Sequence, residues 1–150
     1  MTKRNGILDQ IKNNVVLADG AMGTYAMEKG LVDGDCIEEL NLVRPGDIAE
    51  IHYEYIRAGA QVILTNSFGA NRVKLEQFGL GDKAGELSEA AARIAREAAG
   101  DKQYILGNLS STGQLLTPYG TYKESQFYDA FKEQACILAE WASMVSLSRP

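Results

Sequence analysis

The sequence predicts an α/β fold in which helices alternate with the strands of a parallel sheet. Three short apolar runs, at residues 15–18, 61–65 and 103–107, each end at polar or glycine residues, as buried strands do. Segments with helical periodicity fill the gaps between these runs. Because strands that alternate with helices are joined by right-handed crossovers, we expect the three strands to be parallel.

The spacing of the predicted strands is long enough for a barrel with extended loops. The strands end at Asp19, Thr65 and Gly107, so that one strand–helix unit takes roughly 40–45 residues. A closed barrel of eight such units typically takes about 250 residues. If the sheet belongs to a barrel, these 150 residues supply roughly half of it.

The helical segments carry recognisable start and stop signals. Pro45 suits the first position of a helix, Asp47 and Glu50 place negative charge in its first turn, and Gly59 suits its end. Further helices are predicted over residues 71–78, 86–99 and 124–139. No linker rich in Pro, Gly or Ser interrupts these elements, so we expect a single domain over residues 1–150.

Composition narrows the class of protein. The chain is 45% hydrophobic and 23% charged, which is typical of a globular domain rather than a disordered one. No apolar run approaches the roughly 18 residues of a membrane span, and the net charge of −5 argues against nucleic-acid binding. Two cysteines make no disulfide framework, and no signal sequence precedes the fold, so we expect a cytoplasmic protein without nucleic-acid or membrane partners.

Small and hydrogen-bonding residues gather where the predicted strands end. They lie in segments 19–24, 65–68 and 107–113. Chemistry in parallel α/β folds is located at these carboxyl ends. Asp19 offers a carboxylate for an ammonium group, and the glycines free backbone N–H groups for a carboxylate. The arrangement suits a small zwitterion such as an amino acid, although Asp-Gly segments are also common in simple turns.

The positions of the single histidine and the two cysteines indicate structural roles. His52 lies on a helical apolar stripe, which is typical of a packed histidine, and Cys136 lies mid-helix as a buried small apolar residue would. Cys36 lies in a predicted loop. Because these three residues offer no zinc-binding spacing, we assign neither metal ligands nor catalytic residues.

Several motifs, in order, resemble those of the homocysteine S-methyltransferase family over about residues 12 to 140. The motifs are Asp19-Gly-Ala-Met-Gly-Thr24, Glu38-Glu-Leu-Asn-Leu42 with Pro45, His52, Tyr55-Ile56, Ala58-Gly-Ala60, Thr65-Asn-Ser-Phe-Gly-Ala-Asn71, Leu75, Gly107-Asn108 and Thr112-Gly113. Within the family they are most similar to the homocysteine-binding domain of cobalamin-dependent methionine synthase.

The resemblance implies a TIM (β/α)8 barrel, of which this chain would hold the N-terminal three to four βα units, incomplete. It implies methyl transfer to the thiol of homocysteine, giving methionine, with zinc held by three cysteine thiolates to keep that thiol deprotonated. Methylcobalamin is one candidate methyl donor, beside betaine and S-methylmethionine. Substrate-binding roles carry over to Asp19, to Gly20 and Ala21, and to the strand end formed by Thr65, Asn66 and Ser67.

The sequence also departs from the family pattern. Residues 107–111 replace the usual Gly-Ser-Ile-Gly-Pro, so no binding role carries over to the third loop. The family's zinc cysteines belong to later strands, and neither Cys36 nor Cys136 matches them. We therefore expect a domain that is inactive as it stands, with zinc expected for the family but its ligands absent here. The alternative is a non-enzymatic half-barrel that binds an amino acid, self-associates or pairs with a complementing C-terminal half.

The last ten residues, 141–150, show neither a strand nor a helix pattern. The family continues there with Gly-Val-Asp, a fourth strand and Glu-Thr. A reading frame shifted by two bases crosses the junction between adjacent codons. In that frame, the codons of Trp141-Ala142 and those of Met144-Val145 each give a glycine codon. Permitted codons elsewhere spell Gly-Val-Asp-Gly-Val-Ser-Ile-Glu-Thr, which predicts a frameshifted tail that ends the chain early. A natural, unrelated tail is the alternative.

Overall fold

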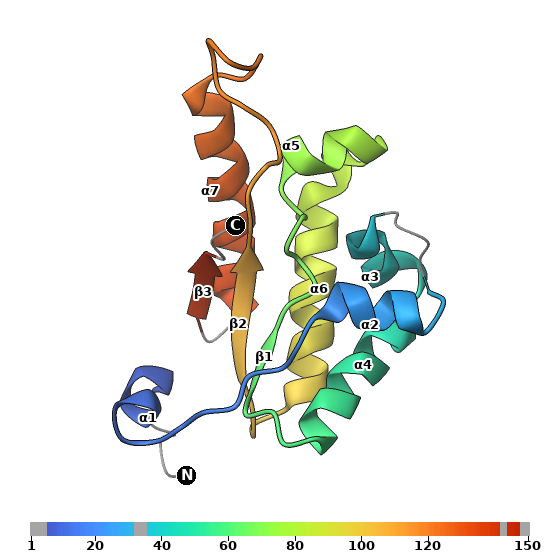
Figure 1. Ribbon diagram of the computed structural model, residues 1–150, viewed down its shortest axis with the longest axis vertical. Coiled ribbons are helices and arrows are strands. Elements are labelled where there is room, and N and C mark those ends of the chain that lie inside the picture. The colour runs from blue at the N-terminus through green and yellow to red at the C-terminus, as the bar shows by residue number, and fades with distance from the viewer. Residues whose placement is uncertain (1–5, 32–35, 142–143, 148–150) are drawn as a thin grey trace.

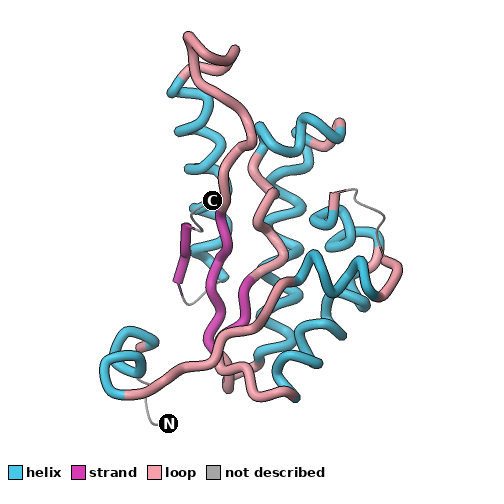
Figure 2. Tube along the Cα trace, in the orientation of Figure 1, coloured by secondary structure: helices cyan, strands magenta, loops and turns pink. Residues whose placement is uncertain are grey.

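A computed structural model describes residues 6–31, 36–141 and 144–147 (Figure 1). Within these residues, three parallel strands form one sheet, β1 (Val62–Leu64), β2 (Tyr104–Leu109) and β3 (Met144–Leu147), in the order β1-β2-β3. Val62 is in register with Tyr104, and Leu106 with Met144. Figure 2 shows the strands side by side, with helices around them. The predicted parallel α/β arrangement is confirmed.

The predicted helices are present with small shifts at their ends. They correspond to α4 (Pro45–Arg57), α5 (Arg72–Leu75) with the 3-10 turn Glu76–Phe78, α6 (Ala84–Ala99) and α7 (Glu124–Trp141). Gly59 follows α4 with a positive φ angle of 105°, as its stop signal indicated, and Gly100 follows α6 with a φ of 53°. The shorter helices are α1 (Ile7–Asn13), α2 (Met22–Glu28), α3 (Leu40–Val43) and the 3-10 turns Ile37–Glu39 and Gly81–Lys83.

The main packing lies between the sheet and its helices. Ile63 of β1 and Ile105 of β2 are fully buried against Ala95 and Ala99 of α6. The small side chains of α6 let its backbone approach the sheet closely. Helix α6 also packs against both α4 and α7. Consecutive strand residues such as Val62 and Ile63 are both buried, which confirms that β1 is covered on both faces.

The segment Val15–Ala18 differs from its prediction as a buried strand. It is extended, but only Ala18 forms a bridge, to Val62 of β1. Val15 is 88% and Leu17 56% exposed. The apolar run identified a segment with strand propensity, but burial also needs a neighbour on the second side, and none lies there among the described residues.

The expectation that residues 141–150 form neither a strand nor a helix is wrong where the structure describes them, whereas the frameshifted origin of this tail stays a prediction. Trp141 ends α7, and Met144–Leu147 forms β3, parallel to β2. β3 therefore occupies the edge of the sheet beside β2. Strand pairing uses backbone groups, so a segment can complete a sheet without a strong side-chain pattern. Residues 142–143 and 148–150 of this tail lie outside the described residues.

His52 is a buried histidine, as its position on the apolar stripe of α4 predicted. It is 0% exposed, and neither ring nitrogen has a hydrogen-bond partner among the described residues. Burial lowers its pKa from 6.5 to about 4. The folded protein therefore holds His52 neutral at pH values where the unfolded chain binds a proton.

We predict that His52→Leu weakens the pH dependence of folding between pH 6.5 and 4. The wild-type chain loses the contribution of neutral His52 as pH falls through this window, up to about 3 kcal/mol of the free energy of unfolding. Urea unfolding at pH 7.5, 6 and 5 measures the effect. Parallel pH profiles for the two proteins would contradict the assignment.

Candidate functional site

A cavity of about 350 Å³ lies where the 15–18 segment, β1 and β2 end. Parallel strands bring these carboxyl ends to one edge, where the sequence placed its candidate residues. The lining residues are Asp19, Gly20, Ala21, Met22, Gly23, Ile37, Glu38, Leu64, Thr65, Asn66, Phe68 and Asn108. Five of the six predicted substrate-binding residues are thus brought together, and Ser67 lies just behind the lining.

Asp19 places a carboxylate in this cavity with one oxygen uncommitted. Its Oδ2 accepts a hydrogen bond from the Leu64 N–H at 2.9 Å, whereas its buried Oδ1 has no partner among the described residues. Burial raises the pKa of Asp19 from 3.8 to about 6, against the opposite effect of its backbone hydrogen bonds. An ammonium group at Oδ1 would pair with the carboxylate and offset the cost of burying it.

Gly20 and Ala21 lie against a tyrosine of α4. A Cβ atom at Gly20 would lie 2.9 Å from the hydroxyl oxygen of Tyr55. That hydroxyl donates to the carbonyl oxygen of Ala21 at 3.4 Å. The turn after Asp19 is therefore shaped by its contact with Tyr55, and the absence of a side chain at Gly20 permits the close approach.

The hydroxyls of Thr65 and Ser67 form a closed set of hydrogen bonds with Asn108. The Asn108 N–H donates to Thr65 Oγ1 at 3.0 Å, and Ser67 Oγ donates to the Asn108 carbonyl at 2.8 Å. The two hydroxyl oxygens are 2.6 Å apart. Because Ser67 uses its proton on Asn108, Thr65 donates to Ser67. These side chains tie the end of β1 to that of β2.

Asn66 is likewise engaged with its neighbours. Its Nδ2 donates to the carbonyl of Ile37 at 3.1 Å and to Asn41 Oδ1 at 2.9 Å. Asn41 Nδ2 donates in return to the Asn66 carbonyl at 2.8 Å. The amide side chain therefore holds the segment before α3 against the end of β1.

A second cavity, of about 360 Å³, lies between α2 and α4. Its lining residues are Ala21, Thr24, Tyr25, Glu28, Glu54, Tyr55 and Ala58. Lys29 pairs with Glu54 at 2.9 Å and lies 4.9 Å from the centre of the Tyr25 ring. No residue of β1 or β2 lines this cavity, and Lys29 already pairs with Glu54, one of its two carboxylates. We therefore place the candidate site at the strand ends.

A sequence model described as homocysteine S-methyltransferase matches residues 16–145. The chain belongs to the homocysteine S-methyltransferase family. Methionine synthase from Mycobacterium tuberculosis is 33% identical over 141 residues, which cover 86% of this chain and 12% of that enzyme. Betaine–homocysteine S-methyltransferase 1 from Danio rerio is 31% identical over 137 residues, 87% of this chain and 33% of the enzyme.

Solved structures of a family member share the fold. The metallated form of the homocysteine methyltransferase MmuM from Escherichia coli aligns with a TM-score of 0.76 at 20% identity, over 96% of this chain and 57% of that one. Its oxidized form aligns with a TM-score of 0.73. The present chain thus spans little more than half of the solved MmuM chains and one third or less of the two enzymes above. Its α/β fold therefore corresponds to part of their barrel.

The described residues do not fit the family's expected zinc site. They contain no group of three or more His, Cys, Asp or Glu side chains placed to hold a metal ion. Cys36 is buried, its Sγ lies 3.4 Å from Glu38 Oε2, and burial together with that carboxylate raises its thiol pKa to about 12. Cys136 is exposed, contrary to its prediction as a buried residue, because it lies on the solvent side of α7. Among the described residues, no helix has the length and apolar character needed to cross a membrane.

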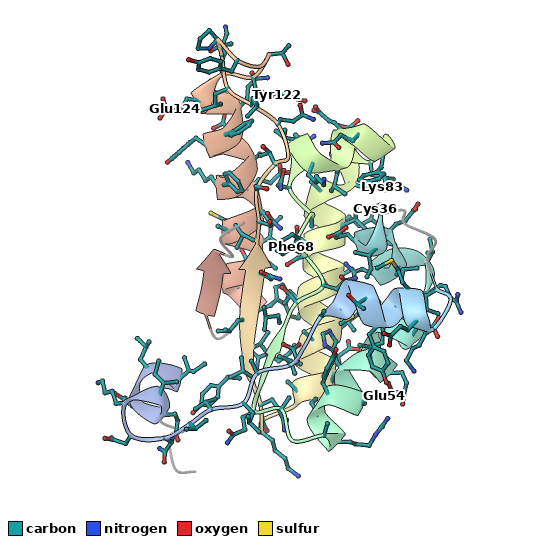
Figure 3. The ribbon with its side chains drawn as sticks, viewed as in Figure 1. Cys36, Glu54, Phe68, Lys83, Tyr122 and Glu124 are labelled. Carbon is teal, nitrogen blue, oxygen red and sulfur yellow. The ribbon has the colours of Figure 1, made fainter. Side chains whose placement is uncertain are left out.

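Glu38 is a charged residue of the cavity lining to which the sequence assigned no role. It is only 6% exposed, and its Oε1 accepts a hydrogen bond from the Gly69 N–H at 2.6 Å. In the sequence, only its place in the Glu38–Leu42 motif pointed to Glu38. Its hydrogen-bond partner, Gly69, lies 31 positions away, so no local pattern links the two residues. Figure 3 labels two of the neighbouring residues, Cys36 beside α3 and Phe68 near the ends of the strands.

We predict that Gly20→Ala destabilises the fold by about 1–3 kcal/mol, because the new methyl group meets the Tyr55 hydroxyl. Gly23→Ala is the matched control: its Cβ would lie 3.9 Å from the nearest atom, Cδ1 of Ile37, and alanine favours helix α2. Chemical unfolding of both variants measures the difference. Equal stabilities would show that Tyr55 does not restrict this turn.

Proposed function

We propose that this chain is the homocysteine-binding portion of a homocysteine S-methyltransferase, and that the cavity at its strand ends holds the amino-acid group of homocysteine. Asp19 would accept the ammonium group at Oδ1. The backbone at Gly20 and Ala21 and the end of β1 at residues 65–67 would surround the rest of the head group. This proposal joins family membership to the geometry of the cavity.

The observation that carries the proposal is the buried Oδ1 atom of Asp19. A buried carboxylate oxygen without a partner is costly, and an ammonium donor satisfies it. The same carboxylate is anchored through Oδ2 to Leu64, so its free oxygen is held in a fixed direction. An amino acid therefore supplies a positive charge, which none of the lining residues carries.

Methylation needs chemistry that the described residues do not provide. In the family, zinc supplies a deprotonated thiol that can attack a methyl group. Since the described residues offer no zinc-binding cluster, we assign this chain substrate binding and assign thiol activation to residues outside the described part. Following the resemblance to the cobalamin-dependent enzyme, we propose methylcobalamin as the methyl donor of the complete site.

We also propose that further polypeptide covers the 15–18 segment. Val15 and Leu17 expose apolar side chains beside an edge that is paired only to β1 within the described residues. The solved relatives extend well beyond the part that this chain matches. A complementing C-terminal half, in the same product or in a partner chain, suits this surface, and a second copy of the chain is the alternative.

We predict that Asp19→Asn raises stability and weakens homocysteine binding. Because the folded pKa of this acid is raised, its charge destabilises the fold above pH 6, and its removal adds about 1–3 kcal/mol at pH 7.5. Calorimetric titration with L-homocysteine should show at least a tenfold loss of affinity. N-acetylhomocysteine, which lacks the ammonium group, should bind neither protein.

Asp129→Asn, on an exposed position of α7, is the matched control and should change neither quantity. Wild-type chain that binds L-homocysteine and its N-acetyl derivative equally would overturn the role of Asp19. If the wild-type chain binds no homocysteine, the proposed function of the cavity is wrong.

The affinity for L-homocysteine should also fall as pH falls through about 6. Asp19 is then protonated and no longer attracts the ammonium group, so one pH unit below this pKa costs roughly tenfold in affinity. Titrations between pH 5 and 8 measure the profile. An affinity that is constant over this range would contradict an ionised Asp19 in the complex.

A further inference from the structure

Phe68 is exposed within a segment that is otherwise buried. Its side chain is 48% exposed and lines the strand-end cavity, whereas Ser67 and Ala70 are 0% exposed. The residues on both sides of this aromatic residue are buried. Its backbone must therefore be fixed for the side chain to stay at the rim of the cavity. The contacts of the two adjacent residues show how.

On the N-terminal side, Ser67 is fixed by two separate elements. Its hydroxyl donates to the Asn108 carbonyl of β2 at 2.8 Å. Its carbonyl accepts a hydrogen bond from Gln134 Nε2 of α7 at 2.6 Å. Gln134 is 1% exposed, so this contact is made inside the packed interior.

On the C-terminal side, Gly69 is fixed by Glu38. The Gly69 N–H donates to Glu38 Oε1 at 2.6 Å, and Cys36 Sγ donates to Oε2 at 3.4 Å. Both oxygens of the buried carboxylate are therefore used. A Cβ atom on Gly69 would lie 2.9 Å from Oε1, so the close approach depends on glycine at this position.

We propose that Glu38 is a positioning residue that sets the side-chain selectivity of the cavity by holding Phe68 at its rim. Met22 and Ile37 line the same cavity and, with Phe68, supply an apolar wall. Such a wall favours an unbranched, sulfur-containing side chain, since sulfur makes favourable contacts with aromatic rings. Asp19, which lines the same cavity, selects the amino group. This inference rests on the proposed function.

The test compares Glu38→Ala with Glu38→Gln, whose side-chain carbonyl can still accept from Gly69. The affinities for L-homocysteine and for L-alanine are measured by calorimetric titration. In Glu38→Ala the ratio of the two affinities should fall about fivefold toward unity, and in Glu38→Gln it should stay within about twofold. A general loss of structure would lower the affinities for both amino acids by the same factor. Equal losses of affinity in Glu38→Ala therefore overturn the proposal.

Amide hydrogen exchange at Gly69, followed by NMR without ligand, tests the positioning independently. Exchange should quicken at least tenfold in Glu38→Ala relative to amides of α6, and stay slow in Glu38→Gln. Unchanged exchange in Glu38→Ala overturns the role of Glu38. If Glu38→Ala does not fold, Glu38→Asp, whose carboxylate is one methylene short, takes its place with the same expectations.

The two measurements also separate this inference from the proposed function. A wild-type chain that binds neither amino acid overturns the proposed function and the selectivity built on it. The exchange rate of Gly69 then still decides whether Glu38 holds the Phe68 backbone. Binding of homocysteine with an unchanged affinity ratio in Glu38→Ala overturns the selectivity alone.

Discussion

The paired hydrogen bonds of Asp19 to β1 connect the edge of the sheet with the candidate site. The Asp19 N–H donates to the Val62 carbonyl at 2.9 Å, and Oδ2 accepts from the Leu64 N–H at the same distance. One residue thus aligns the 15–18 segment with β1 and directs its remaining oxygen into the cavity. The raised pKa of this carboxyl shows that the arrangement lowers stability at neutral pH, a cost expected of a site prepared for a cation.

Most other polar groups at the strand ends are engaged with one another. Thr65 and Ser67 bind Asn108 of β2, and Asn66 and Asn41 exchange hydrogen bonds across the loop before α3. Buried polar groups that satisfy each other make a rigid frame. The frame fixes the backbone around the cavity and leaves few polar atoms unpaired there to bind a ligand. Asp19 differs because its Oδ1 has no partner among the described residues.

Local patterns predicted those elements whose formation is decided locally. Helix α4 has its Pro45 start and its Gly59 stop, β1 is a continuous apolar run, and β2 begins as one. Predictions failed where a distant neighbour decides the outcome. Val15 has strand propensity, yet it is exposed because no second neighbour packs beside it in the described part of the chain. β3 forms at Met144–Leu147 because β2 offers backbone groups to pair with.

The sequence by itself determined the family, the parallel α/β order and the gathering of polar residues at the strand ends, because motifs and periodicity record these features directly. Only the tertiary structure decided which polar atoms stay free. Asp19 keeps one oxygen open, whereas Asn66, Thr65 and Ser67 are bound to neighbours, and Glu38 meets Gly69 across 31 positions. Hydrogen-bond partners far apart in the chain are set by packing, which no local pattern encodes.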